Sequence, residues 1–555
     1  MDFRAAKLSI KADCIKIIKG NSVTNSIEHT DIVVIGAGFS GLYAVHRLRK
    51  DYAVICVEAG DGVGGTWYWN RYPGARVDIE SVEYSYSFDK TLEQEWSWPE
   101  YFSAQPDLER YANHVADRFD LRKDIRLSTT VTRMTFDGTI DRWNVHTSDG
   151  KHIVCKYVVA ATGSLSAANT PPWPGRETFK GQILHTTEWP REGIDFSGKR
   201  VGQIGTGSTG IQAAPIIARE AAHLTIFQRT PAFSMPSGNR PMDAEHEQDW
   251  KANYPARRQE MLSNYGVSLM TRPERSAHEY TPEEQRAILE KGWTSKSAFQ
   301  LMLAFNDVMT DKAANDIVAE FAREKIRGIV KDPVTAELLC PKTYPIGGKR
   351  LCNDAGYYEM YNRDNVSLVD VATAPIVAFT EKGLRTADAE YELDIIITAT
   401  GFDAVTGAMA RIAIEGVNGQ TLADKWANGP TTHLGFMVAG FPNLFMVHGP
   451  MTPGAQAQMI TTGEWQVDFI GRIIDDMEQG GLSRIDATVE AEQRWADEVQ
   501  SVSQFTIHRF ADSWYNGKNI DGKKGGFMIY VGGFPRFAEL CEEAIQANYE
   551  GFLRS

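Results

Sequence analysis

The sequence predicts an α/β protein with two Rossmann-like domains and a helical insertion, and three observations support this fold class. Two buried strands run directly into glycine-rich loops at residues 36–41 and 205–210, and a helical pattern follows each loop. Two more apolar strands, at residues 157–163 and 393–401, both end in Ala-Thr-Gly and bracket the second loop. Between residues 241 and 330 the pattern changes to charged, amphipathic helices.

The composition bounds the class of protein. With 555 residues, 43% of them apolar, the chain is long enough for two to four domains. A net charge of -14 argues against nucleic acid or an anionic membrane as the main partner. No stretch approaches the roughly 18 apolar residues of a spanning helix, and the N-terminus lacks the apolar core of a signal peptide, so we expect a cytoplasmic protein. The six cysteines include no C-x-x-C pair, which argues against a disulfide framework, a metal site and a redox-active dithiol.

The first loop has the spacing that a dinucleotide needs. A strand at residues 31–35 precedes it, and a second strand at residues 53–57 ends in an acid. Gly36 permits the tight turn, Gly38 lets the backbone approach a pyrophosphate, and Gly41 lets the helix pack on the strand. The start of the helix offers free N–H groups to the phosphates. The predicted phosphate- and ribose-binding residues are Gly36, Gly38, Phe39, Ser40, Gly41 and Glu58.

Residues 64–78 follow this unit and have an unusual composition for a loop. They contain a double glycine, two tryptophans and two tyrosines, and the double glycine indicates backbone lying close to a flat group. An isoalloxazine ring is the natural candidate, so we expect the first nucleotide to be FAD. The predicted flavin-binding residues are Gly65, Thr66, Trp67, Asp78 and Tyr84.

The second glycine loop differs from the first at one informative position. Its second strand, at residues 224–228, ends in Arg229 where the first unit has Glu58. A carboxylate at this position repels a ribose 2′-phosphate, whereas a guanidinium binds it with two hydrogen bonds. We therefore expect NADPH rather than NADH. The predicted binding residues are Gly205, Gly207, Ser208, Thr209, Gly210, Arg229 and Thr230.

These elements also predict how the chain is divided. An alternating segment at residues 125–152 is expected to form a small antiparallel unit, and the two Ala-Thr-Gly strands mark the crossings between nucleotide domains. The helical segment is expected to shape a substrate cavity or its lid. The predicted parts are an N-terminal extension (1–28), an FAD domain (29–160 and 398–555), an NADP domain (161–235 and 336–397) and a helical insertion (236–335).

A short connecting segment between the two loops has a family fingerprint. It reads F-x-G-x-x-x-H-x-x-x-W-P, with Phe179, Gly181, His185, Trp189 and Pro190 at the specified positions. Residues 64–78 match a second pattern of the same family, G-G-x-W-x4-Y-P-G-x3-D. In both segments the chain resembles the Baeyer-Villiger monooxygenases, flavoenzymes that turn ketones into esters or lactones. The resemblance runs from about residue 30 to the C-terminus. The length of the loop at residues 451–459 favours the phenylacetone- and steroid-oxidising branch.

The resemblance implies FAD and NADPH as cofactors, and a ketone and O2 as substrates of a reaction through a C4a-peroxyflavin and a Criegee-type intermediate. It implies that Lys349 helps bind the 2′-phosphate and that Trp514 contacts the nicotinamide nucleotide. Arg350 and Asp78 are the expected catalytic residues, because arginine supplies a permanent cation that keeps its proton. The fingerprint is expected to act as a hinge. The expected substrate-pocket residues are Met451, Gly454, Ala455 and Met459.

Three other classes of flavoprotein have a related layout or related motifs. An electrophilic monooxygenase of amines or thioethers has nearly the same layout, but its fingerprint lacks the Trp-Pro ending. A disulfide reductase needs a C-x-x-C pair, which this sequence lacks. A flavin-binding redox sensor without turnover shares the motifs, and NADPH oxidation that rises on adding a ketone would separate it from an enzyme. The motifs do not determine the oligomeric state.

Overall fold

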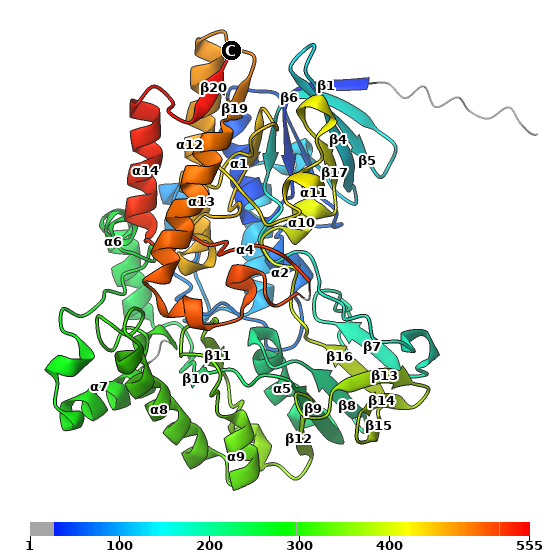
Figure 1. Ribbon diagram of the computed structural model, residues 1–555, viewed down its shortest axis with the longest axis vertical. Helices are drawn as coiled ribbons and strands as arrows, with labels where there is room; N and C mark the ends of the chain where they lie inside the picture. The colour runs from blue at the N-terminus through cyan, green and yellow to red at the C-terminus, as the bar shows by residue number, and fades with distance from the viewer. Residues whose placement is uncertain (1–26, 296–297, 521) are drawn as a thin grey trace, which may run out of the picture.

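The computed structural model describes residues 27–295, 298–520 and 522–555, and the N-terminal extension lies almost entirely outside them. Figure 1 shows two separate sheets, the first beside the long C-terminal helices and the second in the opposite part of the molecule. In each sheet, one strand is followed by a glycine loop and then by a helix. This arrangement confirms the predicted α/β class with two Rossmann-like units.

The first sheet has eight strands in the order β17-β4-β5-β6-β1-β2-β3, with β18 paired to β6. Its parallel part surrounds β1, which pairs with β2 and β6. The expected antiparallel unit is present as β4, β5 and β6, but these strands continue the same sheet and do not form a separate unit. The strands are β1 (Ile27–Ile35), β2 (Val54–Val57), β3 (Ile125–Arg126), β4 (Val131–Asp137), β5 (Arg142–Thr147), β6 (His152–Ala160), β17 (Ala413–Glu415) and β18 (Leu444–Met446).

Helices cover the first sheet and close its core. The first of them, α1, begins at Phe39, three residues before the expected start, because Gly38 already has the extended conformation of an N-cap. It packs against the long helix α12, whose buried residues include Ile470 and Ile473. The helices in this part are α1 (Phe39–Leu48), α2 (Thr66–Trp69), α3 (Lys90–Glu95), α4 (Gln105–Arg118), α10 (Gly407–Ala410), α11 (Leu422–Lys425), α12 (Met459–Gln479), α13 (Val489–Gln504) and α14 (Phe534–Gln546).

The second sheet is parallel throughout, in the order β12-β9-β8-β16-β7, with α5 (Ser208–Glu220) crossing from β8 to β9. Its edge strand β7 lies inside the fingerprint, which the sequence had suggested to be a plain connection. The apolar residues Ile183 and Leu184 pair with β16 and explain the difference. The strands are β7 (Gln182–His185), β8 (Arg200–Ile204), β9 (His223–Gln228), β12 (Val366–Asp370) and β16 (Ile395–Thr398).

The expected helical insertion is divided between two cores. Trp250, Tyr254 and Met261 of α6 pack in the core of the first sheet. The later helices form a separate core, in which Leu289 and Phe321 are buried. Figure 1 likewise shows α6 near α14, and α7 and α8 further away from the first sheet. The helices are α6 (Ala244–Ser263), α7 (Pro282–Thr294), α8 (Lys312–Ile329) and α9 (Pro333–Leu339).

Short strands complete the fold beside the two main sheets. One pair joins the segment after β9 to β11, which begins two residues after Arg350, so a short strand anchors the end of the loop that holds this basic residue. None of the helices in the described ranges is both long and apolar enough to cross a membrane. The short strands are β10 (Ser234–Pro236) with β11 (Cys352–Asp354), β13 (Ile376–Thr380) with β14 (Gly383–Thr386) and β15 (Glu390–Glu392), and β19 (Ile485–Ala487) with β20 (Phe552–Arg554).

Candidate active site

A cavity of about 1030 Å³ lies between the two glycine loops and is lined by residues of the first sheet, of the start of α5 and of the helical segment. This volume is at the upper end of that of ordinary ligand pockets, so the cavity has room for more than one group. The predicted site residues that line it are Gly36, Gly38, Phe39, Ser40, Glu58, Gly65, Thr66, Trp67, Asp78, Tyr84, Ser208, Thr209, Lys349, Arg350, Ala455, Met459 and Trp514.

The remaining predicted residues lie outside the lining of this cavity. Two of the expected pocket residues, Met451 and Gly454, face the protein interior and not the cavity. Met451 has a positive φ of 72° and turns its side chain into the core of the first sheet. Gly454 faces Ile529, whose Cδ1 lies 3.1 Å from the position of an added Cβ. The lining residues of this loop are instead Ala455, Gln456, Ala457, Gln458 and Met459.

The first glycine loop forms a cradle that fits the pyrophosphate of FAD. A Cβ added to Gly65 would lie 2.7 Å from Cα of Gly38, so the two glycine segments meet backbone to backbone. Glu58 fixes this loop because its carboxylate accepts from the N–H groups of Ala37 and Gly60, both at 2.7 Å. Burial raises the pKa of Glu58, and these two donors oppose the shift.

The second glycine loop is built in the same way and opens toward the cavity. Gly205 has a φ of 106°, and a Cβ at Gly207 would meet no atom within 4 Å. Arg229 is exposed at the end of β9. Burial lowers the pKa of Lys349, and the charge of Arg229 lowers it further. Within the described ranges neither cation has a carboxylate at ion-pairing distance, so the pair fits an anionic group such as a phosphate.

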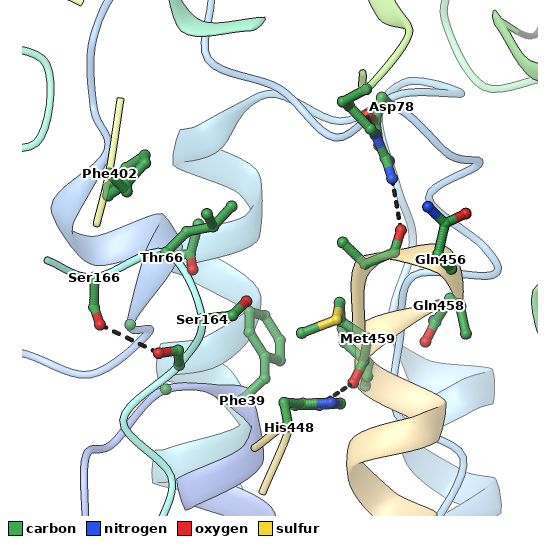
Figure 2. A pocket seen from close by; sticks show the side chains of 18 of the residues that line it. Phe39, Thr66, Asp78, Ser164, Ser166, Phe402, His448, Gln456, Gln458 and Met459 are labelled. Carbon is green, nitrogen blue, oxygen red and sulfur yellow. Dashed lines mark hydrogen bonds and ion pairs between the residues drawn. The ribbon is translucent and has the colours of Figure 1, made fainter. Parts of the chain in front are cut away.

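At the junction of the two loops, Arg350 and Asp78 form a bidentate ion pair. Nη2 of Arg350 donates to Oδ1 and Oδ2 of Asp78 at 2.8 and 2.7 Å, and Nε donates to Oδ2 at 3.1 Å. Nη1 donates to the carbonyl of Ala455 at 2.8 Å. Burial opposes the charge of Arg350, but the carboxylate of Asp78 raises its pKa above the usual value. Figure 2 shows Asp78 and Gln456 on one side of the cavity and Thr66 on the other.

Three residues that line the cavity, Phe299, Tyr515 and His448, were not predicted from the sequence. The guanidinium of Arg350 lies 5.0 Å from the ring centre of Phe299, which comes from the helical segment. Tyr515 is also buried, and this burial raises the pKa of the Tyr515 hydroxyl to about 12. His448 follows β18 and is held between Gln466 and the carbonyl of Met459, at 3.2 and 3.0 Å (Figure 2). Only His448 had a readable signal, as a polar residue at the carboxyl end of a central strand.

A cysteine lies directly behind the ion pair. The thiol of Cys352 is buried and 3.1 Å from the hydroxyl of Ser208, which belongs to the second glycine loop. Burial raises the pKa of this thiol to about 11. All the described cysteines are buried and free, namely Cys56, Cys155, Cys340, Cys352 and Cys541.

The fingerprint connects the second sheet to the cavity. A side chain at Gly181 would overlap Phe179, and Trp189 is buried in the core of the second sheet. Nδ1 of His185 accepts from the N–H of Thr187 at 3.2 Å and lies 2.7 Å from its hydroxyl oxygen. Thr187 and its neighbour Glu188 line the cavity. His185 therefore fixes a turn whose next two residues form part of the cavity wall.

The fold and the cavity define a flavoprotein with two dinucleotide sites. A family model described as flavin-binding monooxygenase-like matches residues 29–270. A Baeyer-Villiger monooxygenase of Pseudooceanicola batsensis is 42% identical over 94% of this chain and 96% of its own. A phenazine N-monooxygenase of Lysobacter antibioticus is 39% identical over 96% of this chain and 98% of its own. The solved structure of an oxidized steroid monooxygenase bound to NADP superposes with a TM-score of 0.90 at 46% identity, covering 95% and 99% of the two chains.

These similarities extend over nearly the whole length of each protein. The chain belongs to the Baeyer-Villiger monooxygenase family. It is an oxidoreductase whose cofactors are FAD and NADP. The predicted family, fold class and cofactors are thereby confirmed.

The contact between Gly41 and Gly36 gives a first testable prediction. A Cβ at Gly41 would overlap the carbonyl oxygen of Gly36, so Gly41→Ala must displace the first turn of α1. We expect a loss of about 1 to 3 kcal/mol in the free energy of unfolding, and a lower FAD content in the purified protein, measured by flavin absorbance. Gly138→Ala is the matched control, because its Cβ would meet nothing within 4 Å. Full FAD content in Gly41→Ala would show that the tight approach is not needed.

Proposed function

We propose that Arg350, held by Asp78, is the catalytic cation with which this chain oxidises ketones at the expense of NADPH and O2. The single observation that carries the proposal is the bidentate pair at 2.7 and 2.8 Å inside the cavity that joins the two nucleotide loops. This geometry supports the proposal, because it fixes a positive charge inside the cavity between the two glycine loops.

The mechanism follows from what Arg350 can and cannot do. Reduced FAD, when bound, supplies the activated oxygen that attacks the ketone carbon. Attack on a carbonyl needs an unprotonated oxygen nucleophile, so a nearby acid would stop the reaction. Arg350 does not supply that proton, because Asp78 raises its already high pKa. The same guanidinium stabilises the oxyanion that develops on the substrate carbonyl after attack.

The other residues bind and orient the two nucleotides in this proposal. The N-terminus of α1 and the loop before it hold the FAD pyrophosphate, and Glu58 keeps that loop in place through two backbone N–H groups. Arg229 and Lys349 bind the 2′-phosphate of NADPH, since they form a pair of cations without a carboxylate partner in the described structure. Trp514 and Tyr515 shield the reacting end from water.

N-oxygenation is a second candidate, because the phenazine N-monooxygenase is as similar as many of the ketone-oxidising relatives. Attack by an amine nitrogen requires an electrophilic, protonated oxygen, and a fixed cation without an acid disfavours that form. The steroid monooxygenase at 46% identity supports the ketone reaction.

A substrate panel tests the proposed function. Linear, cyclic, aryl and steroid ketones, with one aromatic N-heterocycle, are incubated with NADPH under labelled O2, and the product masses are measured. We expect esters or lactones with one labelled oxygen atom. Oxidation of the heterocycle alone, or NADPH oxidation that no ketone accelerates, would exclude the ketone reaction.

The hinge role of the fingerprint is tested by His185→Ala. The variant removes the acceptor of the Thr187 N–H, so the cavity wall at residues 187–188 loses its support. We expect normal FAD binding and reduction, but about two- to tenfold more hydrogen peroxide per NADPH, an effect of about 0.5 to 1.5 kcal/mol for one hydrogen bond. His223→Ala is the control, because this histidine pairs with Ser367 in the same sheet. Unchanged ester yield and coupling in His185→Ala would refute the hinge role.

A further inference from the structure

Arg272 is an exposed arginine that lines the active-site cavity and has no carboxylate at ion-pairing distance in the described structure. The other cavity-lining arginines have partners. Arg350 pairs with Asp78, and Arg76 pairs with Glu100 at 3.0 Å. Arg411 donates to the carbonyl of Ala168 at 2.9 Å. Among the described cavity arginines, Arg272 alone has neither a carboxylate nor a backbone carbonyl as partner, and its hydrogen bond is with the side chain of Tyr265.

The side chain of Arg272 rests on a rigid aromatic support. Its guanidinium carbon lies 4.4 Å from the ring centre of Tyr265. The hydroxyl of Tyr265 donates to the carbonyl of Val531 at 2.7 Å. Gly533 packs so closely on the ring that an added Cβ would lie 2.6 Å from Cδ2 of Tyr265. The guanidinium also hydrogen-bonds with the Tyr265 side chain, and since it has five N–H donors, others can bind an anion.

The loop before Arg272 is also fixed in place. The hydroxyl of Ser268 donates to the buried carboxylate of Glu83 at 2.7 Å, and the backbone N–H of Leu269 donates to the same carboxylate at 3.3 Å. Gly266 accepts a hydrogen bond from the backbone N–H of Gln458 at 2.9 Å. The backbone that leads to Arg272 is therefore tied both to the segment after Asp78 and to the loop of lining residues.

Arg272 and Arg350 line the same cavity. Tyr515 and Tyr265 line this cavity too. Val531, which accepts from Tyr265, lines the cavity as well. A substrate whose carbonyl is near Arg350 can thus extend toward Arg272 along the wall that Tyr265 and Val531 form.

From this geometry we infer that Arg272 is an anion-binding subsite that selects ketones carrying a carboxylate. The net charge of -14 repels anions from the protein as a whole, so a local guanidinium is needed to favour an anionic substrate over a neutral one. A planar carboxylate matches the two N–H edges of the stacked guanidinium. The inference rests on the proposed function, since it specifies the substrate class of that same site.

The test compares keto acids with their uncharged methyl esters. We choose 5-oxohexanoate and 8-oxononanoate, so that two chain lengths sample the distance between the two arginines. In the wild type, kcat/KM should be higher for at least one acid than for its ester. Arg272→Gln should lower kcat/KM for that acid by about ten- to a hundredfold, and leave the ester within about twofold. Arg272→Lys should restore part of the preference, as a charge without the bidentate geometry.

Binding is measured separately from turnover. Heptanoate, which has the carboxylate but no ketone, should perturb the flavin absorbance of the wild type on titration, and its Kd should rise about tenfold or more in Arg272→Gln. Arg411→Gln is the matched control, because this cavity arginine already has a partner. We expect it to change the acid and ester reactions equally.

The outcomes separate this inference from the proposed function. Turnover of esters without any preference for acids, or an equal loss for both in Arg272→Gln, would overturn the anion subsite and leave the ketone reaction intact. A raised KM for NADPH in Arg272→Gln, with an unchanged preference for acids, would assign the guanidinium to the nucleotide and overturn the subsite. No turnover of any ketone by the wild type would refute the proposed function, whereas the heptanoate titration would still report on the subsite.

Discussion

Replacing Arg350 by alanine should lower ester formation by at least about two orders of magnitude. The variant removes the cation beside the oxygen nucleophile and beside the later oxyanion, a loss of about 3 to 4 kcal/mol by comparison with oxyanion-hole deletions. FAD content should stay normal, because the glycine loop at residues 36–41 and Glu58 lie outside the ion pair. NADPH consumption and ester yield, measured together, give the result.

Two further variants separate chemistry from stability. Arg350→Lys should not restore ester formation, because a single ammonium cannot hold both Asp78 oxygens and donate to Ala455 as the guanidinium does. Arg76→Ala removes another ion pair that borders the cavity, and we expect it to keep the ester yield. If Arg350→Ala merely unfolds more easily and forms ester at the wild-type rate per folded enzyme, Arg350 is a structural arginine.

Replacing Arg229 by alanine should lower the affinity for NADPH about ten- to a hundredfold, with little effect on NADH. The guanidinium makes a charge-assisted contact to the 2′-phosphate in our proposal, worth about 1.5 to 3 kcal/mol. The paired cation Lys349 remains, so binding is weakened and not abolished. Titration of both nucleotides, followed by flavin reduction, measures the two affinities.

The control for this second result is another exposed arginine of the same domain. Arg385 lies on β14, away from the glycine loop, and Arg385→Ala should leave both affinities unchanged. Equal losses for NADPH and NADH in Arg229→Ala would mean that this residue does not recognise the phosphate.

The sequence predicted those parts of the fold that are determined by residues close together in the chain. The glycine loops and the acid after β2 follow this rule, because turn, helix start and strand are all encoded within about thirty residues. The strand β7 was missed, since its apolar residues are few and its partner β16 is more than two hundred residues away. A strand at a sheet edge is defined by its partner more than by its own composition.

The candidate site shows the same division between local and distant contacts. The family motifs identified Arg350 and Asp78, but no pattern places Phe299 under the guanidinium, because that contact depends on how the helical segment packs. Helix α6 was grouped with α7 and α8 on its charge pattern, yet its aromatic residues Trp250 and Tyr254 join the core of the first sheet. Met451 was assigned to the pocket from its place in the loop, and the positive φ turned it inward.

The protonated state of the Cys352 thiol affects how readily hydrogen peroxide oxidises this residue. Enzymes that activate O2 release some hydrogen peroxide, and peroxide oxidises thiolates much faster than thiols. Burial raises the pKa of the Cys352 thiol to about 11, so the protonated form dominates at neutral pH. The sulfur atom of Cys352, 3.5 Å from the carbonyl oxygen of Arg350, is thus in the form that peroxide oxidises slowly.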